Sequence, residues 1–365
     1  MRILGVTCGI GSMMIMAREF HEIVGNIEWR NYYHTGTFEH NFKGAFMKKS
    51  WDKLTTQEQE RSKGVDLLIG HTNCGSYSRL NTTGSKTDSM DLPYFMDIVE
   101  KVNPKFFVMD NLPGSLLVIG LEEWIKRFPE YKIELAWISN YNYGNTQKRR
   151  DRLFYIGSKK ELEFTFEPGE YQHDSKMIDV IGDLPEYDVP ELNHIFLKDD
   201  DYMLNLSGHY FQLETPKVTL KQFRETVPVN FQSGNTICYY NKAGDFNKKP
   251  GYKFIDVNHY SPTLDGYENK YRKGNCQPLT TRERARIQGI PDDFIFFPLV
   301  PKTASDRVSL IKQTGKCMPT HFCDYITRVI ANHLGENHSV NITGDSFLKP
   351  NLIIKEQLEL CADLL

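Results

Sequence analysis

The chain has 365 residues, of which 40% are hydrophobic and 25% are charged. This composition is typical of an ordinary soluble globular protein, and the length allows one large domain with a smaller one. Lys and Arg number 44 against 47 Asp and Glu, which gives a formal net charge of −3. This balance excludes a uniformly basic nucleic-acid binder, so any nucleic-acid surface must be a local cluster of basic side chains.

The cysteine pattern excludes the common zinc and dithiol motifs. The chain has seven cysteines and no Cys-x-x-Cys pair, so we expect neither a zinc ribbon nor a redox dithiol, and no bound metal. The first residues show no basic segment followed by a long apolar run, and no stretch approaches the ~20 apolar residues of a membrane span. We therefore expect free thiols and a cytoplasmic protein.

Apolar runs and helical patterns alternate through the first part of the chain. Strand-like runs occur at residues 2–6, 23–29, 65–69, 105–110, 131–138 and 152–157, and helical patterns at 13–22, 95–102 and 121–128. Strands that alternate with helices predict an α/β fold with a parallel, doubly wound, Rossmann-like sheet and helices on both faces. In such a sheet, ligands bind at the carboxyl ends of the strands.

The later part of the chain changes in character. Residues 169–260 are rich in Asp, Asn, Tyr, Pro and Gly, which predicts a smaller, loop-rich domain with short strands, such as one at residues 236–240. Helical periodicity returns at residues 281–288 and 320–334. The last thirty or so residues are mostly polar, with a short helix expected near residues 354–365.

A glycine turn and an acidic strand end indicate a nucleoside cofactor. Residues 9–11 read Gly-Ile-Gly after the first predicted strand, a turn that lets the backbone approach a ligand closely. Glu28 ends the next strand, where a carboxylate can accept ribose hydroxyls, and Trp29 can stack on an adenine face. The alternatives are a turn without ligand and a half-buried core aromatic. The expected cofactor contacts are Thr7, Gly9, Ile10, Gly11, Glu28 and Trp29.

No phosphate-binding motif accompanies this turn. Met14 stands where a dinucleotide-binding turn has its third glycine, and the chain has no Gly-x-x-x-x-Gly-Lys segment. A phosphate-free nucleoside such as S-adenosylmethionine therefore fits better than a dinucleotide.

Three polar segments lie beside later strands of the predicted sheet. Cys74 lies in a polar loop directly after a buried strand, which favours a nucleophile over the usual small core residue. Asp110 ends another strand, either as a helix cap or as a catalytic acid. Arg150 and Arg152 come just before or at the start of the last strand of the set, either as a solvated face or as side chains that hold planar carbonyls and phosphates.

The order of these segments resembles the cytosine-C5 DNA methyltransferase family. The nucleophile loop of that family reads Gly-Gly-Pro-Pro-Cys-Gln-x-Phe-Ser, and residues 70–78 read Gly-His-Thr-Asn-Cys-Gly-Ser-Tyr-Ser. The Glu-Asn-Val-Pro-Gly of the family resembles Asp-Asn-Leu-Pro-Gly at residues 110–114. Its Pro-Gln-x-Arg-x-Arg-Val-Phe resembles residues 146–154, with one extra residue.

Two late motifs extend the resemblance. Residues 279–292 match the family pattern Leu-Thr-x-Arg-Glu-x-Ala-Arg-x-Gln-Gly-x-Pro-Asp. Residues 313–319 resemble Gln-x-Gly-Asn-x-x-Pro, so the resemblance covers about residues 2–330 in family order.

The resemblance implies covalent catalysis on a cytosine flipped out of double-stranded DNA. Cys74 would add to ring carbon C6, and Asp110 would stabilise the adduct at ring nitrogen N3. Arg150 and Arg152 resemble the arginines that hold the base and position the loop. S-adenosylmethionine would donate a carbon to C5. We expect a monomer, and modification of RNA by the same chemistry stays open.

The resemblance also implies a division into domains. We expect a cofactor-binding and catalytic domain at residues 1–168 and a target-recognition domain at residues 169–260. Residues 261–334 would return to the catalytic domain with the late motifs, and residues 335–365 would form a C-terminal tail.

Several residues depart from the family pattern. Asp110 stands where the family has Glu and is one methylene shorter, so contact with N3 needs a closer backbone or a bridging water. Thr72 and Asn73 replace the Pro-Pro pair, and Gly75 replaces a Gln. These changes favour another interpretation, a non-catalytic family member that binds nucleic acid or a partner. The retained Cys74 disfavours it.

Lys316 stands where the family has Asn beside the cofactor. A buried ammonium next to a sulfonium would place two cations together, which is costly. One resolution is carboxy-S-adenosylmethionine, whose carboxylate would pair with Lys316 and whose product would be 5-carboxymethylcytosine. His71 and Asn73 would add polar contacts to that donor. The alternative is that Lys316 points to solvent or pairs with a nearby acid.

Overall fold

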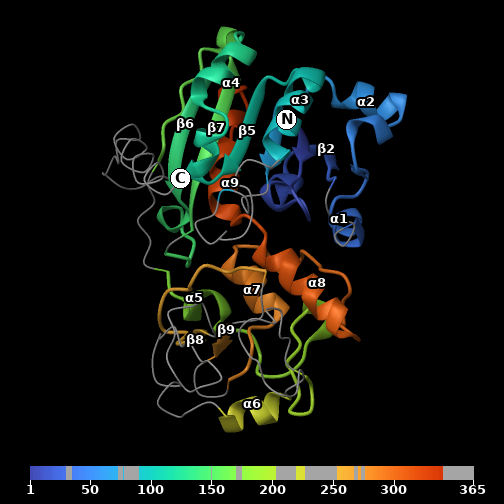
Figure 1. Ribbon diagram of the computed structural model, residues 1–365, viewed down its shortest axis with the longest axis vertical. Helices are drawn as coiled ribbons and strands as arrows, with labels where there is room; N and C mark the ends of the chain where they lie inside the picture. Colours follow the sequence, from blue (N-terminus) through green and yellow to red (C-terminus); the bar gives the residue numbers. More distant parts are fainter. Residues whose placement is uncertain are drawn as a thin grey trace. The chain divides into compact units, whose positions relative to one another are not determined.

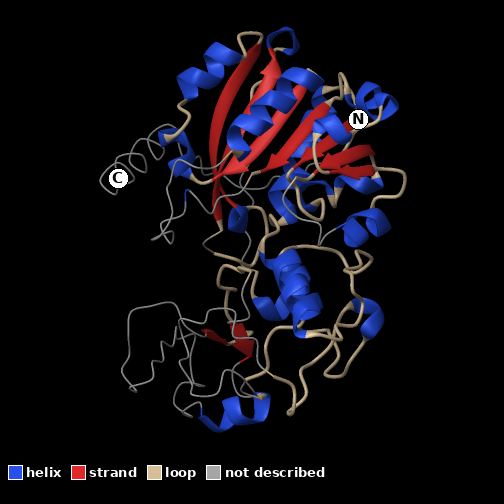
Figure 2. Cartoon of the chain, turned by 45° about the vertical axis from the view of Figure 1, so that its right-hand side comes forward, coloured by secondary structure: helices blue, strands red, loops and turns tan. Residues whose placement is uncertain are grey.

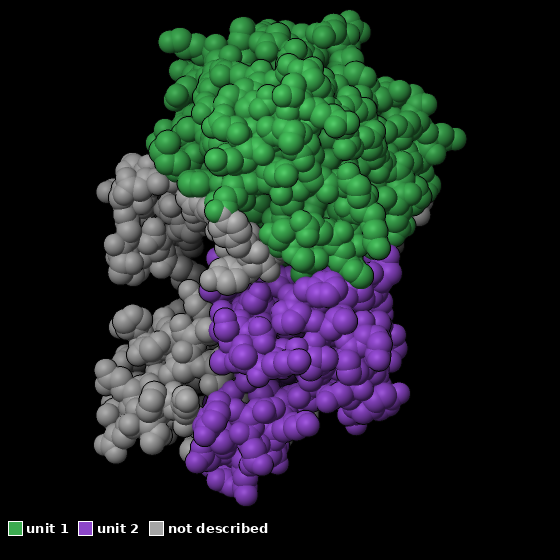
Figure 3. All heavy atoms as spheres, turned by 90° about the vertical axis from the view of Figure 1, so that its right-hand side faces the viewer, with its two compact units in different colours: residues 1–144, 149–173, 318–365 green, residues 145–148, 174–317 purple. Residues whose placement is uncertain are grey.

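The computed structural model describes residues 1–29, 35–72, 77, 90–148, 150–169, 175–202, 219–226, 253–266, 270–272 and 276–339. The chain divides into two compact units (Figure 3). Unit 1 consists of residues 1–144, 149–173 and 318–365, and unit 2 of residues 145–148 and 174–317. None of the helices in the described ranges is long and apolar enough to cross a membrane.

Unit 1 is built on a seven-stranded sheet with the strand order β3-β2-β1-β4-β5-β7-β6 (Figure 1). The predicted α/β, doubly wound architecture is confirmed. The strands are β1 (Arg2–Val6), β2 (Glu22–Ile27), β3 (Phe46–Lys48), β4 (Leu67–His71), β5 (Phe106–Asn111), β6 (Tyr131–Ser139) and β7 (Asp151–Lys159).

The sheet is mixed rather than fully parallel, which corrects the prediction. Strands β1 to β5 pair in parallel, but β7 is antiparallel to both β5 and β6. The cause lies in the short connection from β6 to β7, whose described residues, 140–148 and 150, hold one short 3-10 helix, Asn140–Asn142, but no crossover helix. A parallel connection needs such a crossover, whereas an antiparallel pair does not.

Helices cover both faces of this sheet (Figures 1 and 2). On one face, α3 (Asp91–Val102) and α4 (Leu121–Arg127) share a buried apolar cluster with β1, β4, β5 and β7. On the other face lies α9 (Thr320–His333), where the ring of Phe322 is 4.4 Å from that of Phe154 on β7. Two shorter helices, α1 (Thr35–Asn41) and α2 (Thr56–Ser62), complete the described helices of unit 1.

The helical pattern at residues 13–22 does not form one helix. Two 3-10 helices, Ser12–Met14 and Ala17–Glu19, take its place. Met13, Met14 and Ile15 are buried in succession. The segment therefore lacks the polar face of a surface helix and packs as tight turns. The expected strand at residues 236–240 and helix at residues 354–365 lie outside the described residues.

Unit 2 is smaller and rich in loops. Its helices are α5 (Met177–Ile181), α6 (Leu220–Thr226), α7 (Thr281–Ile287) and α8 (Ala304–Gly315), and β8 (Lys253–Ile255) pairs in parallel with β9 (Lys270–Arg272). The helix predicted at residues 281–288 is confirmed as α7. A reciprocal cap starts it, because Thr280 Oγ1 accepts the Glu283 N–H and the Glu283 carboxylate accepts the Thr280 N–H.

The boundary between the units differs from the predicted domain division. Residues 261–317 cluster with unit 2, because α7 packs against α5 and α8. The chain returns to unit 1 only at Met318, immediately before α9.

A buried arginine organises the core of unit 2. The guanidinium of Arg282 on α7 donates to the carbonyl oxygens of Leu192, Pro291 and Phe294 at 2.7, 2.9 and 2.8 Å. Burial lowers the pKa of Arg282 to about 10, against the opposing charge of Asp292. Two segments of the chain, one at Leu192 and one at Pro291 to Phe294, are thus held by one side chain.

Arg282→Lys tests this role. A single ammonium cannot reproduce a fork aimed at three carbonyls, so buried acceptors lose their donors. We expect the free energy of unfolding to fall by about 3 kcal/mol, measured by urea denaturation. The matched control is Arg307→Lys on α8, where the side chain is partly exposed and the change should stay within about 0.5 kcal/mol. Equal midpoints for the two variants would show that Arg282 is not a structural anchor.

Candidate active site

The turn after β1 holds three left-handed residues. The angle φ is 58° at Gly9 and 83° at Gly11, and it is 55° at Thr7, where a β-branched residue is rarely left-handed. A Cβ atom on Gly11 would lie 2.5 Å from the ring of Phe42. Backbone strain of this kind clusters at functional sites, so it supports a ligand at this edge of the sheet.

Glu28 and Trp29 lie at the carboxyl end of β2, beside that turn. Glu28 Oε2 accepts the N–H of Gly9 at 2.8 Å, which ties the predicted ribose acceptor to the glycine turn. The indole N–H of Trp29 donates to the buried carboxylate of Asp91 at 2.9 Å. This hydrogen bond fixes one edge of the indole ring, and Trp29 remains 36% exposed.

Asp110 and His71 face each other on adjacent parallel strands. They are register partners at the ends of β5 and β4, and His71 Nδ1 lies 2.6 Å from Asp110 Oδ1. The side chain of Asp110 is 1% exposed and that of His71 is 14% exposed. The sequence predicted the acid but not its contact with His71. The signal was the equivalent position of both residues at the ends of neighbouring strands.

One arginine on β7 lies beside the same acid, and a second arginine just before that strand is buried. Arg152 Nε lies 3.7 Å from Asp110 Oδ2, and Arg150 is also buried, with its carbonyl oxygen accepting from the Asn140 amide at 3.1 Å. Among the described residues, neither Asp110 Oδ2 nor Arg152 Nε has a hydrogen-bond partner. Buried polar atoms without partners commonly mark a position that a ligand or water completes.

The Thr72 side chain forms hydrogen bonds to the end of the neighbouring strand, at the point where the predicted nucleophile loop begins. Its hydroxyl donates to the carbonyl oxygen of Asp110 at 3.2 Å and accepts from the side-chain amide of Asn111 at 2.6 Å. Asn111 in turn accepts the backbone N–H of Leu112 at 2.7 Å. A residue that departs from the Pro-Pro pattern therefore has a defined structural role. It ties the start of the loop to the segment that carries Asp110.

Comparison with known proteins decides the family. The family model "C-5 cytosine-specific DNA methylase" matches residues 1–332. The chain belongs to this family.

The chain is similar along most of its length to the Type II methyltransferase M.FnuDI of Fusobacterium nucleatum, at 27% identity over 79% of this chain and 80% of that protein. It is similar to M.MthTI of Methanothermobacter thermautotrophicus at 26% identity, over 86% of this chain and 92% of that protein.

Solved structures of distant relatives share the fold. DNMT2 of Spodoptera frugiperda has a TM-score of 0.59 at 13% identity and covers 90% of this chain and 99% of its own. Dnmt2 of S. pombe has a TM-score of 0.56 at 13% identity and covers 92% of this chain and 99% of its own. At these identities the likeness concerns the fold alone.

The predicted nucleophile of this C5 methylase, Cys74, lies outside the described residues, as does Asn73. The chain reaches Cys74 two residues after Thr72. Cys8 and Cys323 are poor nucleophiles, because burial raises the pKa of both thiols well above their ordinary value.

Lys316 belongs to unit 2 and follows the last turn of α8. Its backbone N–H donates to the carbonyl oxygen of Lys312 at 3.0 Å, and its side-chain carbons pass within 3.6 Å of the Cβ position of Gly266. The residue is exposed, as in the alternative interpretation that Lys316 points to solvent or pairs with a nearby acid.

The arginine motif spans the two units. Arg150 and Arg152 lie in unit 1, whereas the preceding Gln147 lies in unit 2. Gln147 Nε2 donates to Gln288 Oε1 at 2.7 Å, and Gln147 Oε1 accepts the N–H of Leu264 at 2.8 Å. The first half of the motif is therefore a structural anchor, and in the second half Arg152 lies beside Asp110.

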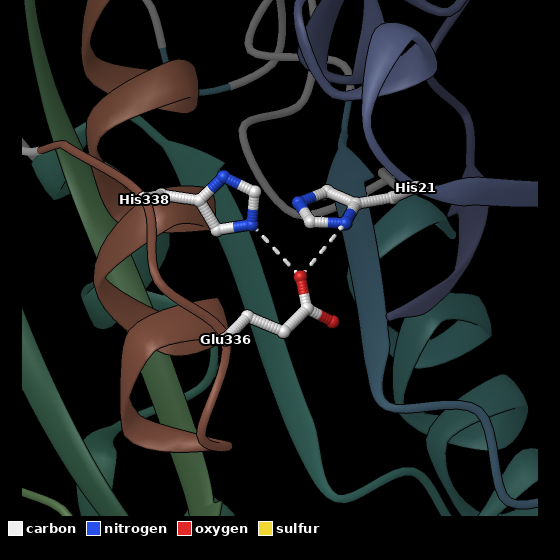
Figure 4. A group of neighbouring side chains, drawn as sticks. All are labelled: His21, Glu336 and His338. Atoms are coloured by element: carbon white, nitrogen blue, oxygen red, sulfur yellow. Dashed lines mark hydrogen bonds and ion pairs between the residues drawn. The ribbon is translucent and has the colours of Figure 1, made fainter.

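A second group of polar side chains gathers in unit 1, away from these strand ends (Figure 4). Glu336 Oε2 lies 3.4 Å from His21 Nδ1 and 2.8 Å from His338 Nε2, and Glu336 Oε1 accepts from the Met1 amino group at 2.6 Å. The three side chains offer ligand atoms within 4.8 Å of one another, close enough for a metal ion. The bond from Met1 already uses the carboxylate, so the group also serves as an ionic clasp.

The pKa shifts within this clasp predict a loss of stability in acid. Burial is the main cause that lowers the pKa of His21 to about 4. Burial alone would raise the pKa of Glu336, but bonds from the Met1 amino group and His338 outweigh it and lower the pKa to about 2.

As the pH falls, the unfolded chain binds a proton at His21 at a higher pH than the folded protein does. The free energy of unfolding should therefore fall as pH drops from about 6.5 toward 4. Glu336 should add a further loss as pH drops from about 4.5 toward 2. His21→Asn should remove the upper window, measured by urea unfolding at a series of pH values. His259→Asn, at an exposed histidine, is the control and should keep the wild-type profile. A wild-type stability that is flat from pH 6.5 to 4 would contradict the assignment.

Proposed function

We propose that this C5 methylase modifies cytosine in double-stranded DNA through a covalent adduct on Cys74. The observation that carries the proposal is the pairing at the ends of β4 and β5. A buried carboxylate, Asp110 on β5, lies 3.7 Å from Arg152. The neighbouring strand β4 ends at His71, three residues before Cys74. Acid, cation and thiol are the groups that addition to a cytosine ring requires.

The roles of the residues follow from the chemistry of the ring. The Cys74 thiolate forms a bond to C6, which pushes electron density toward C5 and N3. A proton donor at N3, in the place of Asp110, stabilises that density, and Arg152 offers a donor to the carbonyl edge of the base. Loss of the C5 proton after transfer expels the Cys74 sulfur and restores the ring.

The turn after β1 fits the nucleoside part of S-adenosylmethionine. Gly9 and Gly11 keep the turn free of side chains, the Glu28 carboxylate lies against it, and the partly exposed Trp29 adjoins it in sequence. We propose contacts from Thr7, Ile10 and these four residues. When bound, the cofactor supplies an electrophilic carbon on a sulfonium sulfur.

Recognition of the target is proposed for the loop-rich segment at residues 169–260. Direct readout depends on a few side chains that reach base edges, and irregular loops can present them. An enzyme cannot reach the ring carbons of a cytosine that is stacked inside a duplex, so base flipping accompanies this proposal.

A carboxymethyl donor is a second candidate, which rests on Lys316 at the position of the family Asn. The Lys316 ammonium would pair with the carboxylate that such a donor carries in addition.

The covalent step predicts trapping on DNA that contains 5-fluorocytosine. Fluorine at C5 cannot leave as a proton would, so the adduct persists and migrates as a protein–DNA band under denaturing conditions. Cys74→Ala should abolish both trapping and transfer. Cys276→Ala, at a buried cysteine of unit 2, should retain both. Persistent trapping by Cys74→Ala would refute the mechanism.

The donor is identified by mass spectrometry of nucleosides from DNA incubated with the protein and each donor separately. We expect a gain of one methyl group with S-adenosylmethionine. Carboxymethyl incorporation that is lost in Lys316→Asn but kept in Lys312→Asn, one turn earlier on α8, would establish the second donor. No modification of varied DNA with either donor would leave a non-catalytic nucleic-acid-binding protein as the better interpretation, unless RNA is modified instead.

A further inference from the structure

We propose that His71 is the proton donor to the cytosine ring and that Asp110 orients it, so the two together replace the single Glu of the family. This inference rests on the proposed function. It assigns a role to a residue that stands where the family motif has Gly.

The two departures from the family pattern lie face to face. Position 71 changes from Gly to His, and position 110 changes from Glu to Asp. The ladder makes these residues direct partners on β4 and β5. Partners across a parallel pair project on the same side of the sheet, about 4.8 Å apart. The shorter acid therefore leaves room that the larger imidazole occupies.

The contact between them is a hydrogen bond rather than simple packing. His71 Nδ1 and Asp110 Oδ1 are 2.6 Å apart, a distance that requires a hydrogen between nitrogen and oxygen. Asp110 is deeply buried, whereas His71 keeps more of its side chain exposed. A base that enters from solvent meets the imidazole before it meets the carboxylate.

The other carboxylate oxygen is directed to Arg152. Asp110 Oδ2 lies 3.7 Å from Arg152 Nε, so the acid stands between an imidazole and a guanidinium. A carboxylate so placed fixes the tautomer and ring orientation of the histidine, as in other Asp–His pairs. Thr72 holds the backbone of Asp110 and keeps the two strand ends in register.

The proton balance is simple. As the Cys74 sulfur bonds to C6, the N3 lone pair takes a proton from the imidazolium of His71, and the N–H bond of that ring breaks. When the sulfur leaves after transfer, N3 returns the proton to His71. The pair is therefore regenerated in each turnover. The C5 proton passes to solvent water, its electron pair restores the C5–C6 double bond, and the sulfur leaves as a thiolate.

A double-mutant cycle tests the assignment. His71→Gly removes the donor and leaves an acid that is too short, so kcat should fall by about 10²- to 10⁴-fold, the usual contribution of a general acid. Asp110→Glu adds a methylene to a contact that is already 2.6 Å and should reduce kcat to a similar extent. The double variant restores both family residues and should recover to within about tenfold of wild type. KM for DNA should change much less than kcat in every variant.

The pH profile separates a catalytic role from a structural one. A general acid loses activity as pH rises past its own pKa, so replacing an imidazole with a carboxyl group should move the alkaline limb of the kcat profile in the double variant. A purely structural contact would leave that limb unchanged. Thermal unfolding of each variant confirms that it folds, and His259→Gly, at an exposed histidine, is the matched control.

The outcomes distinguish this inference from the function on which it rests. If wild-type protein modifies no cytosine, the proposed function fails and the inference fails with it. If wild type is active and His71→Gly keeps the full rate, only the role of His71 is overturned. That role is likewise overturned if the double variant is no better than the poorer single variant.

Discussion

The pairing of β4 with β5 is the constraint on which the site depends. These strands are parallel neighbours in the middle of the sheet, so their carboxyl ends meet at one edge. The pairing brings together His71, Asp110 and the start of the segment that leads to Cys74, and the neighbouring strand β7 adds Arg152. A one-residue shift in this register would turn one side chain of the pair to the opposite face. The buried apolar residues on both faces are what hold the register in place.

Much of the fold could be predicted from the sequence because the strands of unit 1 are apolar enough to be recognised in isolation. Residues 2–6, 105–110 and 131–138 correspond closely to β1, β5 and β6. The direction of β7 could not be read from its own residues, because direction depends on how the chain returns. The segment after Gly11 was predicted wrongly for a related reason: Met13, Met14 and Ile15 are buried in succession, which imitates part of a helical pattern without a polar face.

The residues of the candidate site could be predicted from the sequence, but their contacts could not. Asp110 was predicted because an acid at the end of a buried strand stands out locally. The contact with His71 was not, because it joins residues 39 positions apart in the chain and depends on the strand register. Lys316 stood out as a substitution, but its exposure depends on how α8 ends and on the packing around Gly266. Motifs therefore located the residues, and tertiary pairing determined what they touch.

A comparison of Arg282 with the pair of Asp110 and Arg152 shows why one motif is structural and another is a candidate site. Arg282 meets three carbonyl acceptors at hydrogen-bonding distance, so its burial is compensated within the fold. Asp110 Oδ2 and Arg152 Nε are just as deeply buried, yet among the described residues neither has a hydrogen-bond partner. Folding alone gains nothing from leaving an acceptor and a donor 3.7 Å apart and incompletely bonded. A planar ring with a donor and an acceptor on adjacent edges would satisfy both atoms. The contrast with the fully bonded Arg282 therefore supports a ligand or water that completes the position beside Asp110 and Arg152.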